Sequence, residues 1–146
     1  MVNDYRTVLV AIDCSEDSSR ILARAAAVAG KDATLHLIHV IEPLALAYGA
    51  DIPMDISDLQ TTLMERAHNS ALSHAEHFAI PAERVHVELG SIEKTIQGKA
   101  DQLAADLIVV GCHTRTGLAL LLGSTARGLV PGAHCDVLAV KVDPQP

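Results

Sequence analysis

The sequence predicts an α/β fold: one doubly wound, five-stranded parallel sheet in the order 3-2-1-4-5 with four helices. Five short aliphatic runs alternate with longer segments whose apolar residues recur every three or four positions. These runs are nearly continuous in apolar residues, as in parallel strands buried on both faces. Apolar residues make up 49% of the chain, yet its only aromatic residues are Tyr5, Tyr48 and Phe78. A core of Ala, Val, Ile and Leu suits helices packed closely over a sheet.

The first third of the chain predicts a strand, a helix and a second strand. Val8–Ile12 is the first aliphatic run, and Ser15 or Asp17 can cap the helix that follows it. Gly30 ends that helix, since a glycine readily takes the left-handed conformation of a helix C-terminus. Thr34–Val40 is the second strand.

A long connection and a long helix come next. The segment Ile41–Ile56 exceeds the usual length of a strand-to-helix loop, which predicts a functional flap. Ser57 and Gln60 form an S-x-x-Q capping box, so a helix is expected from there to about Phe78. Its apolar residues, at spacings of three and four, are Leu59, Leu63, Ala67, Ala71, Ala75 and Phe78.

The second half of the chain continues the alternation. Val85–Leu89 is the third strand and Leu107–Val110 the fourth, which we expect to stop at Gly111. A helix from Ser124 to about Ala133 leads to the last strand, Val137–Val142. The helix between the third and fourth strands carries its apolar residues at Ile92, Ile96, Ala100 and Leu103.

Length and composition exclude several classes of protein. A chain of 146 residues predicts a single domain, 1–146. The net charge of −7 does not favour binding to nucleic acid or to an anionic membrane, since both require an excess of basic residues. Cys14, Cys112 and Cys135 are an odd number without C-x-x-C spacing, which favours a reducing compartment. No apolar run reaches about 18 residues, so neither a membrane span nor a signal segment is expected and the localisation is cytoplasmic.

Strand order places a ligand crevice at one position in this fold. Ligands of doubly wound sheets bind at the carboxyl ends of the strands, where the winding reverses. With the fourth strand beside the first, this point lies between Asp13, which follows strand one, and Gly111, which follows strand four. Gly123-Ser124-Thr125 opens a helix, and a helix N-terminus favours an anion such as phosphate. Together these features predict a phosphate cradle.

At this point the chain resembles the universal stress protein family along nearly its whole length. The resemblance rests on Asp13 after the opening strand, on His39-Val40, and on the run Asp106–Gly111. The loop Thr116–Thr125 and the closing Cys135–Val140 complete it. Membership implies a Rossmann-like sheet of the adenine nucleotide alpha hydrolase-like type and a cytoplasmic, stress-responsive regulator.

Nucleotide-binding members of that family resemble the pattern G-x-x-G-x9-G-[S/T] around the triphosphate. Gly111, Gly123 and Ser124 match it, but Thr114 stands at the second glycine, and eight residues instead of nine separate it from Gly123. A β-branched residue is strained at a positive φ. The departure puts triphosphate geometry in doubt and leaves mono- and diphosphates open.

The resemblance implies an adenine nucleotide (ATP, ADP or AMP), with Mg²⁺ as an optional companion held by the Ser124 or Thr125 hydroxyl. Asp13 would face the ribose or adenine, and the backbone at Val40 would hold the adenine edge. The residues implied around the nucleotide are Ala11, Ile12, Asp13, Val40, Gly111, His113, Thr114, Arg115, Gly123, Ser124 and Thr125.

Structural interpretations stand beside these functional ones. Asp13 can simply cap the first helix, and Cys112 at a strand end can be a packed thiol. None of the eight histidines joins a ligand set with closed zinc-site spacing, so no metal site is predicted. The chain has no G-x-S-x-G elbow, and we assign no catalytic residue.

The sequence leaves two functions open beside a nucleotide switch. One is an interaction module of the same fold with an empty crevice, which Thr114 favours and Gly123-Ser124 disfavours. The other is a weak ATPase or autophosphorylating enzyme. We expect an unknown protein partner and a homodimer through the last strand, Val137–Lys141, whose apolar edge would otherwise pair without control.

Overall fold

Five parallel strands form one sheet in the order β3-β2-β1-β4-β5, which confirms the predicted order. A computed structural model describes residues 5–43, 57–112 and 128–142. The strand bounds are β1 Thr7–Ala11, β2 Thr34–Ile41, β3 Val85–Leu89, β4 Leu107–Cys112 and β5 Asp136–Lys141. The aliphatic runs therefore mark the strands to within one or two residues.

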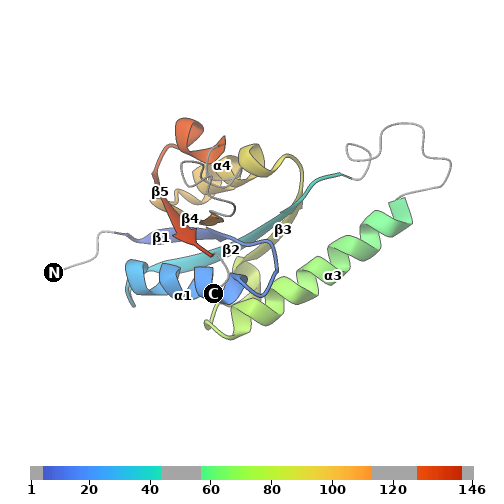
Figure 1. The fold of residues 1–146 in the computed structure, drawn as a ribbon, viewed down its shortest axis with the longest axis horizontal. Helices are drawn as coiled ribbons and strands as arrows, with labels where there is room; N and C mark the ends of the chain where they lie inside the picture. Colours follow the sequence, from blue (N-terminus) through green and yellow to red (C-terminus); the bar gives the residue numbers. More distant parts are fainter. Residues whose placement is uncertain (1–4, 44–56, 113–127, 143–146) are drawn as a thin grey trace.

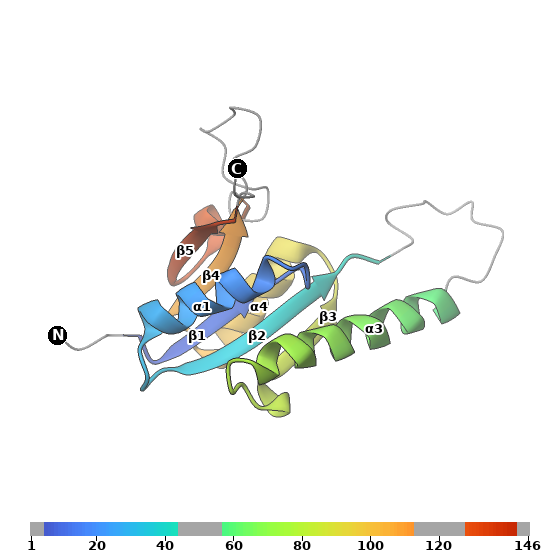
Figure 2. The same cartoon turned by 60° about the horizontal axis from the view of Figure 1, so that its bottom comes forward.

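Helices cover both faces of this sheet. α1 (Ser18–Ala29) and α3 (Ser57–Glu76) lie on one face, and α4 (Ile92–Leu103) lies on the other (Figures 1 and 2). Short 3₁₀ turns, η1 (Ala82–Arg84) and η3 (Val130–Gly132), precede β3 and β5. The predicted helix at 124–133 lies largely outside the described residues, and its described end is helical at Gly128 and Leu129 before η3.

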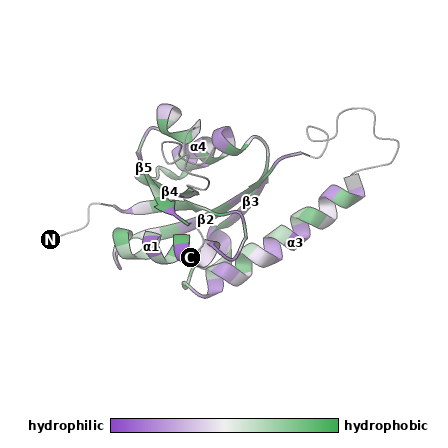
Figure 3. Cartoon of the chain, viewed as in Figure 1, coloured by the Kyte–Doolittle hydropathy of each residue, from purple (hydrophilic) through white to green (hydrophobic). Residues whose placement is uncertain are grey.

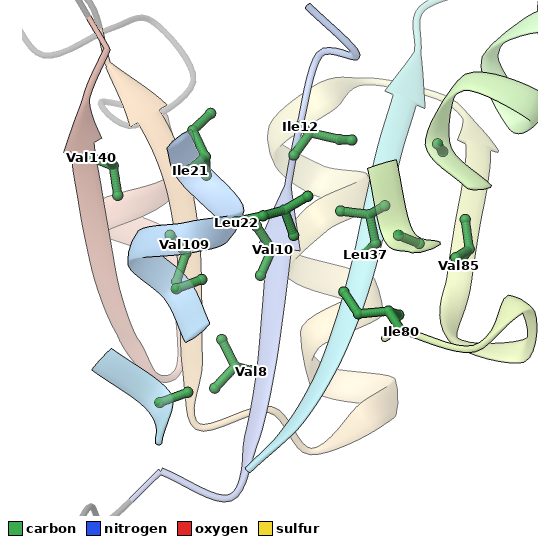
Figure 4. Close-up of a cluster of buried hydrophobic side chains, with 14 of the residues drawn as sticks. Val8, Val10, Ile12, Ile21, Leu22, Leu37, Ile80, Val85, Val109 and Val140 are labelled. Carbon is green, nitrogen blue, oxygen red and sulfur yellow. The ribbon is translucent and has the colours of Figure 1, made fainter. Parts of the chain in front are cut away.

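Alternation along the strands divides the core in two. Val8 and Val10 of β1 point toward α1 and α3, where they meet Leu22, Leu37 and Val109 (Figure 4). The opposite core centres on Leu9, Ile38 and Ile108 under Ile96 and Ala100 of α4. β1 and β4 are thus apolar on both faces, as their sequences predict, because helices bury both faces of a parallel sheet, while β2 also carries His36 and His39.

β4 does not stop where its sequence suggested. The strand continues through Gly111 to Cys112, and these two residues pair with Val140 and Lys141 of β5. The prediction that strand four stops at Gly111 is therefore wrong. A glycine lowers strand propensity, but the β5 ladder supplies hydrogen bonds that hold the chain extended.

α3 is only partly packed on the sheet. Hydrophobic and hydrophilic residues alternate along it (Figure 3), but among its predicted apolar residues only Ala71 and Ala75 are fully buried. Leu59 is 48% exposed because the amino-terminal half of the helix extends past the end of the sheet (Figure 2). The chain is helical from Ser57, the first described residue of this segment, and the helix ends at Glu76, slightly before Phe78.

Candidate functional site

A cleft lies at the carboxyl ends of β1, β2 and β4, between the two helical layers. Its volume is about 190 Å³, and β1 and β4 meet there because the winding of the sheet reverses between them. The residues that line it are Ala11, Ile12, Asp13, Asp17, Ile21, Ile38, His39, Val40, Ile92, Ile96, Val110, Gly111 and Val142.

The described walls of the cleft are aliphatic with a small polar edge. Ile21 of α1 and Val142, the residue after β5, line it from one face of the sheet, and Ile92 and Ile96 of α4 line it from the other. The charged side chains among the lining residues are carboxylates, Asp13 and Asp17, without an accompanying Lys or Arg. Such walls suit a flat apolar group with hydrogen-bond donors at its rim more than an anion.

Hydrogen bonds within the β1–α1 turn hold the Asp13 carboxylate. Its Oδ1 accepts from the Ser15 backbone N–H at 2.9 Å and from the buried Ser18 hydroxyl at 3.5 Å. Cys14 between them has a φ of 63°, which lets the chain turn sharply after β1. The two predicted caps share the start of α1: Asp17 occupies the N-cap position without a side-chain cap bond, while the Ser15 hydroxyl oxygen accepts from the Asp17 N–H at 3.3 Å.

The neighbouring Cys14 side chain faces away from this polar edge. Its thiol donates to the Ala67 carbonyl of α3 at 3.9 Å. Burial raises the pKa of the Cys14 thiol, and the negative charge of Asp13 raises it further, against a lowering hydrogen bond with Ser70. Cys14 therefore stays protonated and packs as a small apolar side chain. Cys112, at the end of β4, is likewise a buried free thiol, as its strand-end position predicted.

Main-chain groups of β1 and β2 form the wall beside Asp13. The Ile12 N–H donates to the Ile38 carbonyl at 3.0 Å, which extends the β1–β2 ladder by one bond. The Ile12 carbonyl lies 2.8 Å from Nδ1 of His39. Because a carbonyl oxygen can only accept, Nδ1 carries a proton and donates it, which fixes the tautomer of the neutral imidazole.

Gly111 allows α1 to approach β4. A Cβ at this position would lie 2.7 Å from Cδ1 of Ile21 and 3.6 Å from Cγ2 of Val142. The packing of α1 against β4 is thus sufficient to explain why this residue is a glycine. That the Gly111 backbone also contacts a ligand stays a prediction.

The described part of the predicted site comes together at this cleft: Ala11, Ile12, Asp13, Val40 and Gly111 all line it. The sequence argument missed the other lining residues: Asp17, Ile21, Ile38, His39, Ile92, Ile96, Val110 and Val142. Asp17 comes four residues after Asp13, at the N-cap of α1, and His39 directly precedes Val40, so each lies close in sequence to a predicted contact residue. Six predicted residues lie outside the described residues: His113, Thr114, Arg115, Gly123, Ser124 and Thr125.

Comparison with known proteins identifies the family of this chain. The family model described as the universal stress protein family matches residues 4–141. The chain belongs to the universal stress protein family. Universal stress protein A homolog 1 of Coxiella burnetii (strain RSA 493 / Nine Mile phase I) is 39% identical to it over 138 residues, which cover 93% of this chain and 96% of that protein.

Solved universal stress protein structures share the fold. UspA from Lactobacillus plantarum superposes with a TM-score of 0.70 at 24% identity, covering 93% of this chain and 97% of that one. A universal stress protein in complex with cAMP gives a TM-score of 0.58 at 24% identity, with 94% and 98% of the two chains covered.

Two further features of this universal stress protein bear on its chemistry. In residues 5–43, 57–112 and 128–142, no three His, Cys, Asp or Glu side chains gather in a way that could hold a metal ion. Over the same ranges, no helix has both the length and the hydropathy needed to span a bilayer.

Proposed function

We propose that this universal stress protein binds an adenine nucleotide in the cleft between β1 and β4, and that occupancy switches its contact with a protein partner during a cytoplasmic stress response. The observation that carries the proposal is the cleft itself. It lies at the reversal point of the sheet, where ligands of this architecture bind, and five predicted contact residues line it.

The described walls suit the nucleoside end of such a ligand. Ile38, Ile92 and Ile96 offer an apolar surface for a planar base, and Val40 presents main-chain polar groups beside it. The Asp13 carboxylate accepts hydrogen bonds, and the ribose hydroxyls can supply them. The relative solved with cAMP is a precedent for an adenine nucleotide on this fold.

The phosphates would extend away from these carboxylates, because like charges within a few ångströms repel. Beyond the end of β4 the sequence offers Arg115 and the Gly123-Ser124-Thr125 helix start, which we propose as the phosphate site. The Ser124 or Thr125 hydroxyl would hold Mg²⁺ if the nucleotide carries one. Mg²⁺ would neutralise phosphate charge there.

Calorimetric titration with ATP, ADP and AMP, with and without Mg²⁺, tests the proposal. Asp13→Asn removes the charge but keeps an oxygen for the Ser15 N–H, so the turn should survive. We expect micromolar binding to the parent chain and roughly tenfold weaker binding to Asp13→Asn, since a hydrogen bond to a charged group contributes about 1.5–3 kcal/mol. Asp101→Asn, a change from carboxylate to amide in an exposed hydrogen bond with His134, is the matched control and should bind normally.

An interaction module with an empty crevice is the second candidate, and Thr114 at the second motif glycine favours it. Absence of heat with all three nucleotides would overturn the nucleotide proposal and leave this one. Slow ATP hydrolysis or autophosphorylation ranks below both, because Asp13, Asp17 and His39, which could act as bases in the described walls, lie at the proposed nucleoside end and away from the proposed phosphate site.

We also propose a homodimer through β5. This strand lies at one edge of the sheet, and Val137, Leu138 and Ala139 are partly exposed along it. An uncovered apolar edge strand can pair with another chain through its unpaired main-chain groups. A symmetric dimer covers this edge on both copies and leaves none free for further pairing.

A further inference from the structure

The His39 side chain occupies a position that a main-chain bond normally fills. The Ile12 N–H bonds to the Ile38 carbonyl, so in a parallel ladder the Ile12 carbonyl would next accept from the Val40 N–H. The register between β1 and β2 instead ends at Ala11–Ile38, and the imidazole of His39 donates to the Ile12 carbonyl at 2.8 Å. A side chain has replaced the next main-chain donor.

This replacement leaves the Val40 N–H open on the cleft side. The Gly90 N–H bonds to the Ile41 carbonyl, so Ile41 directs its polar groups toward β3. Because successive residues of a strand direct their main-chain groups to opposite neighbours, Val40 faces β1. Within the described residues its N–H has no main-chain partner, and Val40 lines the cleft.

We propose that His39 is a positioning residue for the ligand. By satisfying the Ile12 carbonyl, its Nδ1–H keeps the Val40 N–H available to a hydrogen-bond acceptor, such as a ring nitrogen of the base. This inference rests on the proposed nucleotide function for the identity of the ligand. The main-chain arrangement itself does not depend on that function.

Imidazole suits this task because its donor works at any physiological pH. Nδ1 carries a proton both in the neutral tautomer that the Ile12 carbonyl requires and in the imidazolium, so the bond to Ile12 survives a change in protonation. The rigid ring also fixes the Nδ1–H with only two side-chain torsions. With a side chain at position 39 that is too short or lacks a donor, the Ile12 carbonyl would be free to accept a hydrogen bond from the Val40 N–H.

Two variants separate this role from simple packing. His39→Phe keeps a ring but removes the donor, so the ladder should advance one step and the Val40 N–H should bond to Ile12. His39→Asn places an amide N–H near the position of Nδ1 and should restore the parent arrangement. Amide hydrogen exchange of Val40, followed by NMR in the ligand-free protein, reports the change directly. We expect exchange at least about tenfold slower in His39→Phe than in the parent or His39→Asn, a protection typical of one local hydrogen bond.

Calorimetry with the adenine nucleotides is the second readout. We expect roughly three- to tenfold weaker binding to His39→Phe and parent-like binding to His39→Asn, as for the loss of one hydrogen bond. If Val40 exchanges equally fast in both variants and the parent, the positioning role is wrong, whatever the nucleotide affinity. If Val40 becomes protected in His39→Phe but no nucleotide binds the parent chain, the arrangement stands and the nucleotide proposal fails.

Discussion

Two glycines of this chain show how neighbours decide the effect of one added methyl group. Gly111 has Cδ1 of Ile21 at 2.7 Å from where a Cβ would stand, whereas Gly98 on the exposed side of α4 has no atom within 4 Å. The same substitution should therefore have opposite effects at the two positions.

Gly111→Ala should destabilise the protein by about 1–2 kcal/mol, because the Cδ1 end of Ile21, buried between α1 and β4, must shift to make room for the added methyl group. Gly98→Ala should stabilise it by about 0.5–1 kcal/mol, since alanine restricts the unfolded chain and favours helix. Urea unfolding of both variants measures the difference. Equal shifts in the same direction would contradict the packing argument for Gly111.

His36 and His86 form a stacked pair on the α4 face. Their ring centroids are 5.4 Å apart, and Nδ1 of His36 lies 3.2 Å from Nε2 of His86, so one ring donates to the other. Burial lowers the pKa of His36, with further lowering from the charges of His86, Arg84 and Lys99. Burial also lowers the pKa of His86, as does Lys99, while Glu88, which is ion-paired to Lys99, opposes the shift.

Stability should therefore fall as the solution becomes acidic. Both histidines take up protons more readily in the unfolded chain, so the free energy of unfolding decreases as pH drops below about 6.5, the ordinary histidine value. The decrease continues until the pH passes the lowered pKa values of the folded pair. Urea midpoints between roughly pH 7.5 and pH 5 measure the slope.

The double variant His36→Gln/His86→Gln should flatten this slope. The parent chain, unfolded in the same series of buffers, gives the slope for comparison. A slope that persists in the double variant would assign the acid sensitivity to other groups.

At the scale of elements, the hydrophobic pattern of the sequence was sufficient to predict the strands of the sheet, but it was insufficient to predict which residues of α3 are buried. A strand buried on both faces must be aliphatic throughout, so β1 and β4 are visible in the sequence. An amphipathic helix, in contrast, shows which residues share a face but not whether the sheet extends beneath them. Leu59 lies on the predicted face of α3 and is nevertheless 48% exposed, because that end of the helix passes beyond the sheet.

The candidate site divides in the same way. Strand order alone brought Asp13 and Gly111 together, since the reversal point follows from topology. The role of His39 could not be predicted, because it depends on the ladder between β1 and β2 ending at Ala11–Ile38 and leaving the Ile12 carbonyl to a side chain. The pattern of apolar residues does not show at which residue pair two neighbouring strands stop forming main-chain hydrogen bonds.

One side chain connects the starts of two neighbouring strands. The Asp106 carboxylate, just before β4, accepts from the backbone N–H of Arg6 at 2.9 Å and of Thr7 at 3.1 Å, at the start of β1. The Asp106 N–H in turn donates to the Thr7 carbonyl at 2.9 Å. This contact fixes the amino-terminal end of the central strand.

Asp106→Ala should destabilise the protein by about 1–2 kcal/mol, because hydrogen bonds to a charged acceptor are lost at a partly exposed position. The Arg6 and Thr7 amides should also exchange faster than in the parent chain. Thermal unfolding and amide exchange measure the two effects. Asp136→Ala, which removes the carboxylate bonded to the Tyr5 hydroxyl, is the comparison and should leave both amides protected.

At the scale of the whole molecule, the two edges of the sheet differ. The β3 edge carries Glu88, which is ion-paired with Lys99, and the exposed Leu89, whereas the middle of β5, between Asp136 and Lys141, is the apolar run Val137, Leu138 and Ala139. Charged residues protect an edge from pairing, and apolar residues promote it. The β5 edge is therefore the better candidate for contact with a second copy.

Alternate residues of β5 direct their main-chain N–H groups toward β4 or outward, and this alternation identifies a substitution that tests the dimer contact. The Val142 N–H donates to the Cys112 carbonyl, so even-numbered residues of β5 face β4 and Ala139 directs its N–H outward. Ala139→Pro removes only this outward donor, a change that edge strands tolerate. We expect the parent chain to sediment at twice its 15.4 kDa mass and the variant at the single-chain mass, with an unchanged circular dichroism spectrum. Ala139→Ser retains the N–H and should remain a dimer; a folded Ala139→Pro dimer would place the interface elsewhere.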